Sequence, residues 1–123
     1  MHASIWKFTG DPDRLLASYD SLLAEMPSAE FIAHLCLRAP DGMVIVDTCP
    51  SQEAFERFAT SDDFRDACSR HGLAEPAELR DYPVHAAFVN GAAQAVHTYA
   101  ARFSAGSGRR DPGGERTARR SPA

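Results

Sequence analysis

Two histidines stand out among the 123 residues as side chains placed for proton transfer. His71 follows Cys68 by three residues at the end of an apolar helical stripe, so both side chains are expected on one face of that helix. His34 belongs to a segment in which apolar and polar residues alternate. An imidazole titrates near neutrality and can act as a general base. We therefore predict His71 and His34 as candidate catalytic residues, and the alternative for His71 is a histidine that interacts with the negative end of a helix dipole.

Aromatic side chains near these histidines suggest a site for a planar ligand. Trp6 and His34 could frame an aromatic substrate, with His34 hydrogen-bonded to a phenolic oxygen. The alternative is that these rings only pack in the core or stabilise its boundary. The candidate substrate-binding residues are Trp6, Tyr19, Phe58, Phe64 and Cys68.

Other reactive residues give weaker signals. Cys68 and His71 have a spacing suited to a metal, but zinc needs three or four ligands and no second pair matches, so we predict no metal and no cofactor. Cys49 precedes an expected helix, whose dipole would lower the pKa of its thiol, but no resolving cysteine or neighbouring base is evident. Asp47 lies within an expected strand, where we predict an ion pair with Arg38. The chain contains no phosphate loop, nucleophile elbow or nucleotide fingerprint.

The elements that would position these residues can be read from periodicity and from turn residues. A strand is expected over 3–8, then a helix that starts at Asp11-Pro12 and is ended by Pro27. A hairpin follows, with strands over 30–38 and 43–47 joined by Pro40-Asp41-Gly42. A two-part helix runs from 51 to Gly72, with a second capping signal at 60–63. A last strand over 84–89 and a weaker helix over 92–103 complete the expected elements.

This β-α-β-β-α-β order predicts a ferredoxin-like α+β fold, a four-stranded antiparallel sheet with two helices on one face. The other face of the sheet would expose apolar side chains to water, which predicts a homodimer that packs sheet against sheet. We expect a domain over 1–91, a C-terminal helix over 92–103 and a disordered basic tail over 104–123.

Charge and cysteine usage narrow the range of partners. The net charge of -4 divides into -7 for residues 1–103 and +3 for residues 104–123. An acidic body argues against nucleic acid as a partner, and no apolar run is long enough to span a membrane. Three cysteines cannot all pair within one chain and no apolar signal segment follows Met1, so we predict a cytoplasmic protein.

The pattern resembles the dimeric α/β-barrel superfamily, specifically the small proteins related to antibiotic biosynthesis monooxygenases. The element order and two helical runs, residues 51–58 (SQEAFERF) and 61–65 (SDDFR), carry the resemblance, which covers residues 1–91. It implies a homodimer with a cleft between helices and sheet, and cofactor-independent oxidation, or a related isomerisation or cyclisation, of a small aromatic metabolite.

Two alternatives remain open within this resemblance. One is a non-catalytic ligand-binding or structural homodimer of the same fold. The other is haem binding, as in the haem-degrading relatives. It is less expected, because Cys68 stands where those relatives have their histidine ligand and Phe58 stands where they have a tryptophan.

Overall fold

The computed structural model describes residues 1–26 and 32–96 of the chain. The chain divides into two units, residues 1–85 and a second that begins at residue 86, and each is considered by itself. The predicted tail over 104–123 lies outside the described residues.

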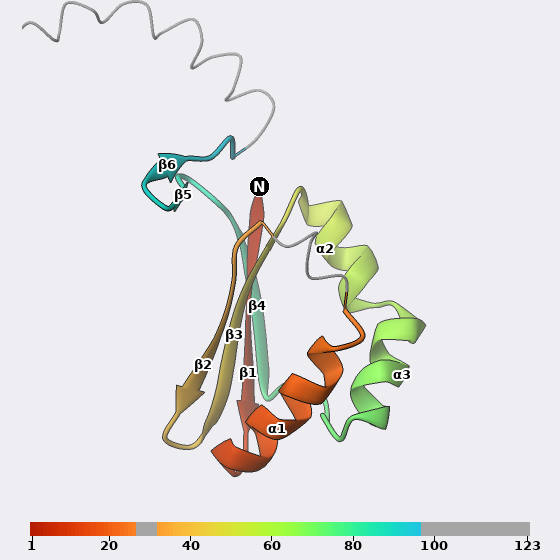
Figure 1. Cartoon of the computed structure of the whole chain (residues 1–123). Helices are drawn as coiled ribbons and strands as arrows, with labels where there is room; N and C mark the ends of the chain where they lie inside the picture. Colours follow the sequence, from red (N-terminus) through yellow and green to blue (C-terminus); the bar gives the residue numbers. More distant parts are fainter. Residues whose placement is uncertain (27–31, 97–123) are drawn as a thin grey trace, which may run out of the picture. The chain divides into compact units, whose positions relative to one another are not determined.

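The first unit is built on a four-stranded antiparallel sheet (Figure 1). Its strands are β1 (His2–Thr9), β2 (His34–Ala39), β3 (Gly42–Cys49) and β4 (Glu78–Pro83), in the spatial order β2-β3-β1-β4. Strand β1 is central and pairs with both β3 and β4. With the helices between β1 and β2 and between β3 and β4, this order gives the ferredoxin-like α+β fold that the sequence predicts.

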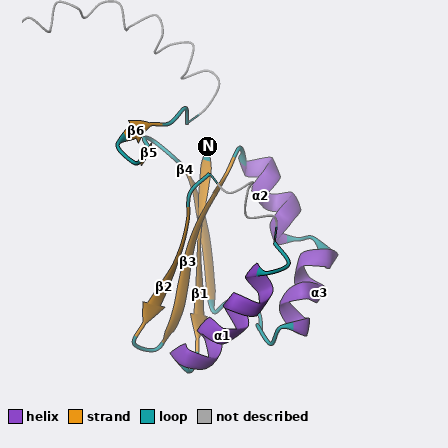
Figure 2. Ribbon diagram, in the orientation of Figure 1, coloured by secondary structure: helices purple, strands orange, loops and turns teal. Residues whose placement is uncertain are grey.

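Three helices lie on one side of this sheet and none of the described helices lies on the other (Figures 1 and 2). They are α1 (Pro12–Leu23), α2 (Gln52–Ala59) and α3 (Asp62–Arg70). Each begins at a side chain that accepts a hydrogen bond from a backbone N–H of the first turn: Asp11 for α1, Ser51 for α2 and Ser61 for α3. The two-part helix expected between 51 and Gly72 is thereby confirmed.

The core lies between the helices and the sheet. Alternate residues of β1 point into it, among them Trp6 and Phe8, and Met43 of β3 is fully buried. The opposite face of the sheet leaves large apolar side chains exposed; they are Ile5, Leu35, Leu37 and Tyr82.

The last strand of the sheet differs from the prediction. Strand β4 spans Glu78–Pro83, which the sequence pattern marks as a polar connection, and not 84–89. As an edge strand, β4 is paired only with β1, and its polar residues stay at least partly exposed. Phe88–Val89 (β5) instead pairs with Ala92–Ala93 (β6) in the second unit, across a turn in which Asn90 and Gly91 both have positive φ.

Two element boundaries also differ. The helix expected from residue 92 does not form at its start, since 92–93 are in β6 and 94–96 are not helical; residues 97–103 lie outside the described part. Helix α1 ends at Leu23 and not at Pro27, because Glu25 and Met26 bond the carbonyls three residues back in a tighter turn.

Candidate functional site

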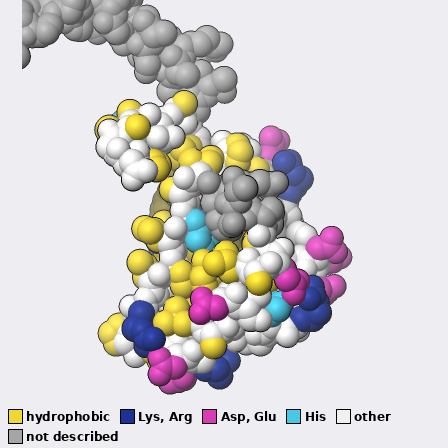
Figure 3. Space-filling model, viewed as in Figure 1, with side chains coloured by type: hydrophobic (Ala, Val, Ile, Leu, Met, Phe, Trp, Pro, Cys, Tyr) yellow, Lys and Arg dark blue, Asp and Glu magenta, His cyan; other side chains and the backbone are white. Residues whose placement is uncertain are grey.

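A small cavity of about 50 Å³ lies between α1, α3 and the helix-facing side of the sheet. Its walls are mostly apolar: aromatic rings come from β1, α2 and α3, and aliphatic side chains come from Leu22 of α1 and from Met26 in the turn that follows α1. A space-filling view shows hydrophobic side chains gathered between α1 and the strands β2 and β3 (Figure 3). Four lining residues are able to form hydrogen bonds through their side chains in addition to Trp6; they are Tyr19, His34, Asp47 and Cys68.

Three of these polar residues form a hydrogen-bonded chain. The hydroxyl of Tyr19 lies 2.7 Å from Nε2 of His34, and Nδ1 of His34 lies 3.1 Å from Oδ1 of Asp47. The Tyr19 and His34 rings also stack, with centroids 5.9 Å apart. Because a carboxylate only accepts, Nδ1 of His34 carries a proton, and in the neutral imidazole Nε2 accepts the Tyr19 hydroxyl proton.

The register of the hairpin places His34 beside Asp47. Ala39 pairs with Gly42 across the turn, and counting back along both strands puts His34 directly opposite Asp47. The predicted pair between Asp47 and Arg38 is therefore wrong. Arg38 lies opposite Met43, nearer the turn, and its guanidinium donates to Asp13 at a distance of 2.9 Å.

The environment keeps the hydroxyl of Tyr19 protonated. Its pKa is raised above 10.0, first by desolvation and then by nearby negative groups, among which is Asp47. At neutral pH Tyr19 is consequently a neutral donor to His34.

Aromatic rings form the wall next to this chain. The Trp6 ring meets Phe64 at a centroid distance of 5.7 Å and Phe58 at 6.4 Å, both edge to face, and Phe58 and Phe64 are 4.2 Å apart. The Trp6 indole N–H donates to Ser4, so it is already used. Burial raises the pKa of the Cys68 thiol, which therefore contributes a neutral side chain to the cavity.

The second predicted histidine does not line the cavity. His71 caps the C-terminal end of α3, where Nδ1 lies 2.5 Å from the Ser21 hydroxyl and Nε2 contacts the Glu25 carboxylate. Arg70 donates to the same carboxylate. His71 thus connects the ends of α1 and α3 outside the cavity, whereas His34 and all five predicted substrate-binding residues line it.

Asp47 has a different role in the structure from the one that the sequence predicts. The sequence predicts Asp47 as a partner of Arg38, whereas in the structure Asp47 lines the cavity and its carboxylate accepts a hydrogen bond from His34. A two-residue turn at Pro40-Asp41 pairs residue 39 with residue 42, and this register would have placed Asp47 opposite His34.

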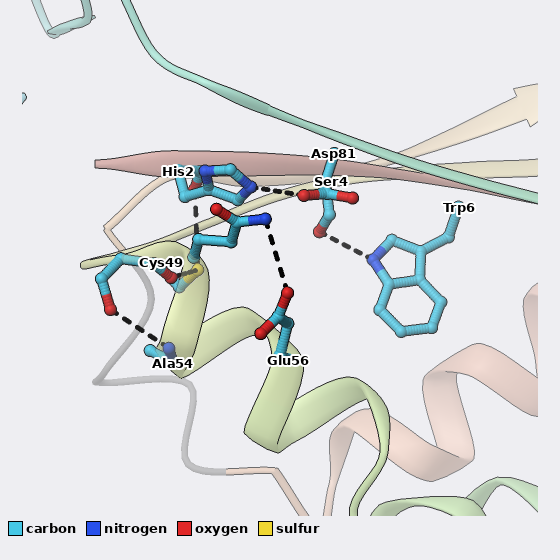
Figure 4. A network of polar contacts seen from close by, with 9 residues as sticks. His2, Ser4, Trp6, Cys49, Ala54, Glu56 and Asp81 are labelled. Carbon is cyan, nitrogen blue, oxygen red and sulfur yellow. Dashed lines mark hydrogen bonds and ion pairs between the residues drawn. The ribbon is translucent and has the colours of Figure 1, made fainter.

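A separate polar network surrounds the beginning of β1 (Figure 4). The buried His2 ring bonds Asp81 at 2.5 Å, and the Cys49 thiol lies 3.2 Å from the carbonyl of Ser51. Burial raises the pKa of Cys49, so the lowered pKa expected from the helix dipole is wrong.

Within residues 1–26 and 32–96, no three His, Cys, Asp or Glu side chains come together as a possible metal site. No helix among the described residues is both long and apolar enough to cross a bilayer.

Comparison with known proteins gives a structural neighbour and no sequence relative. No family model and no curated protein matches the chain. A crystal structure of a "putative Antibiotic biosynthesis monooxygenase" from Chloroflexus aurantiacus J-10-fl is similar, with 21% sequence identity and a TM-score of 0.49. The similarity covers 72% of this chain and 98% of that chain.

Proposed function

We propose that the protein binds a small hydroxylated aromatic metabolite in the cavity beside His34 and catalyses its oxidation by dioxygen without a cofactor. The observation that carries this proposal is the chain formed by Tyr19, His34 and Asp47 in the wall of an otherwise apolar cavity. A base oriented by a carboxylate, next to an aromatic wall, is the arrangement that deprotonation of a phenol requires.

Proton transfer would follow the hydrogen bonds already present. A substrate hydroxyl that donates to the Tyr19 oxygen extends the chain to Nε2 of His34. When the proton reaches His34, the resulting imidazolium is stabilised by the Asp47 carboxylate. The apolar walls exclude water from the phenolate that remains.

The deprotonated substrate is electron-rich and supplies the electrons for dioxygen. For a phenol with a ring C–H para to the hydroxyl, the balanced reaction is C₆H₅OH + O₂ → C₆H₄O₂ (quinone) + H₂O. The ring supplies all four electrons that reduce dioxygen: one oxygen atom becomes the new quinone carbonyl, and the other leaves as water with the hydrogen atoms of the ring C–H and the hydroxyl. The protein contributes the base, the orientation of the ring and a dry site.

The size of the cavity limits the substrate. Sites for drug-sized ligands measure roughly 300–1,000 Å³, whereas this cavity measures about 50 Å³. Benzene occupies an engineered cavity of about 150 Å³, so entry of even a single aromatic ring against Trp6 and Phe64 would require lining side chains to move. A single ring is therefore the largest ligand that we propose. Binding without turnover is the alternative function, and the same cavity would serve it.

The proposal includes a homodimer, supported by the bare face of the sheet. Leu35 is 58% exposed, Leu37 44% and Ile5 39%, and these side chains share one face. Packing this face against a second copy would remove its apolar surface from water. The cysteines, none of which is paired with another, are consistent with the reducing cytoplasm that we propose as the compartment.

The test is a thermal-shift screen with monocyclic phenols, followed by oxygen-electrode measurements on each ligand that binds. We expect His34→Ala to abolish oxygen consumption, while His71→Ala, the matched control outside the cavity, retains it. Binding without oxygen consumption would favour the non-catalytic alternative. Loss of turnover in His71→Ala with full activity in His34→Ala would overturn the assignment of the base.

A further inference from the structure

A second and larger hollow, of about 430 Å³, lies between α3, the segment 73–76 and strand β4. It exists because β4 is an edge strand that the helices leave partly uncovered, so Leu79 remains 38% exposed although it points to the helix side. The aromatic rings of Trp6 and Phe64 and the aliphatic Leu73 and Leu79 contribute an apolar surface to its lining.

Two charges of opposite sign complete the lining. Arg65 projects from α3 and Glu75 from the segment that follows it, and both are exposed. Within the described part of the chain, neither forms an ion pair, in contrast to Arg38 and Arg70. The Ser69 hydroxyl lies one helical turn after Arg65 and lines the same hollow.

We propose that this hollow binds a zwitterion with an apolar side chain, an apolar α-amino acid. Its carboxylate would pair with Arg65 and accept a hydrogen bond from Ser69, and its ammonium group would pair with Glu75. The side chain would cover the exposed surface of Leu79.

The charges around the hollow favour a zwitterion over a simple ion. A plain carboxylate would meet Glu75 and an acidic body, since residues 1–103 carry a net charge of -7. A plain amine would meet the unpaired Arg65. A molecule that carries both charges can pair with Arg65 and with Glu75, and it is neutral overall.

This site does not depend on the proposed oxidation. The hollow shares Trp6, Phe8, Phe64, Cys68 and Leu73 with the smaller cavity, but His34, Tyr19 and Asp47 do not line it. Removing His34 should therefore leave amino-acid binding intact, so that failure of one proposal is distinguishable from failure of the other.

The experiment is a titration of the full chain with L-phenylalanine and L-leucine by isothermal calorimetry. Trp6, the single tryptophan, lines the hollow, and its fluorescence gives a second readout. The comparison ligands are 3-phenylpropanoate, which lacks the ammonium group, and 2-phenylethylamine, which lacks the carboxylate. We expect L-phenylalanine to bind more tightly than either by about tenfold, since each lost charged hydrogen bond costs about that much.

Two surface substitutions test the charged contacts directly. Arg65→Gln and Glu75→Gln should each weaken L-phenylalanine binding about tenfold, whereas Arg57→Gln and Glu53→Gln on α2, outside the lining, should not. All four side chains are exposed, so folding should be unaffected, and circular dichroism checks this. The proposal is overturned if no amino acid binds, if the three phenyl compounds bind equally, or if Arg65→Gln and Glu75→Gln bind like the unmodified chain.

Discussion

The Tyr19 hydroxyl and Nε2 of His34 are 2.7 Å apart, and their rings stack with an interplanar angle of 16°. This contact joins α1 to β2, an edge strand of the sheet. Both side chains also line the apolar cavity. The same hydrogen bond thus serves both the packing of α1 and the proposed proton path.

Tyr19 should make the fold sensitive to alkaline pH. Its pKa is raised above 10.0, chiefly by desolvation. The protonated phenol is therefore favoured in the folded state, and this contribution is complete below pH 10 and lost as the pH rises through the raised value. We expect Tyr19→Phe to lose about 1 kcal/mol at pH 7 and to show a shallower decline in unfolding free energy above pH 10. Urea unfolding at pH 7, 10 and 11 measures both, and parallel curves for the two proteins would contradict the assignment.

Asp47 should act as a positioning residue for His34. In Asp47→Asn the amide can present N–H to Nδ1, which favours the tautomer with the proton on Nε2 and removes the acceptor for Tyr19. We expect the rate of phenol oxidation to fall about 100-fold, as for loss of a positioned base, with little change in phenol affinity. The pH profile of the rate should move as well, which a purely structural role would not cause. The matched control is Asp13→Asn, which breaks the surface pair with Arg38 and should leave the rate unchanged.

Local signals in the sequence were sufficient for the starts of the helices α1 and α3 and for the turn of the hairpin, but not for the end of α1 or for the helix expected from residue 92. Asp11 caps α1, and Ser61, within the capping signal at 60–63, caps α3, because a cap depends only on residues three positions apart. The final strand depends on distant pairing. The apolar run at 84–89 has the better local pattern, but the residues that pair with β1 are 78–83, where Leu79 lies opposite Trp6.

The candidate site, too, could be predicted only as far as local signals in the sequence allow. Alternation along β2 groups His34 with Cys36 and Arg38 on one face, but it does not say which face the helices cover, and the more apolar Leu35 and Leu37 lie on the open face. His71 continues the stripe of Cys68, yet it lies at the end of α3, beyond the core, where side chains of α1 reach it. Which end of a helix is covered is decided by tertiary packing and not by periodicity.

Glu25 should contribute to stability on the acid side of neutrality. Its pKa is lowered from 4.5, first by the hydrogen bond with His71 and then by Arg70. A lowered pKa stabilises the fold above the unfolded value near 4.5, and the contribution disappears as the pH falls through the lower folded value. In Glu25→Gln the difference in stability between pH 6 and pH 3 should be smaller than in the unmodified chain. Urea midpoints at pH 6 and pH 3 provide the measurement. If the difference between them is the same in Glu25→Gln as in the unmodified chain, the contact between Glu25 and His71 does not contribute to stability.

Gly42 should tolerate no side chain. A Cβ at this position would lie 1.9 Å from the Phe8 carbonyl oxygen, which belongs to the paired strand β1. The carbonyl oxygen belongs to the backbone of β1 and the Cβ would be attached directly to the backbone of β3, so these two strands would have to separate. We expect Gly42→Ala to destabilise the fold by about 1–3 kcal/mol, the usual cost of overpacking. A thermal melt within one degree of the unmodified protein would contradict this steric account.

The bare face of the sheet predicts the oligomeric state. If two copies pack through this face, Leu35→Glu buries a carboxylate in the interface at a cost of about 3 kcal/mol or more, which raises the dissociation constant over about a hundredfold. Sedimentation velocity should then change from dimer to monomer. Leu79→Glu is the matched control, since Leu79 is an exposed leucine on the helix side of the sheet. The control should remain a dimer, because its carboxylate stays in water. A monomeric unmodified chain would exclude the sheet-to-sheet dimer, and a monomeric Leu79→Glu with a dimeric Leu35→Glu would place the contact on the helix side.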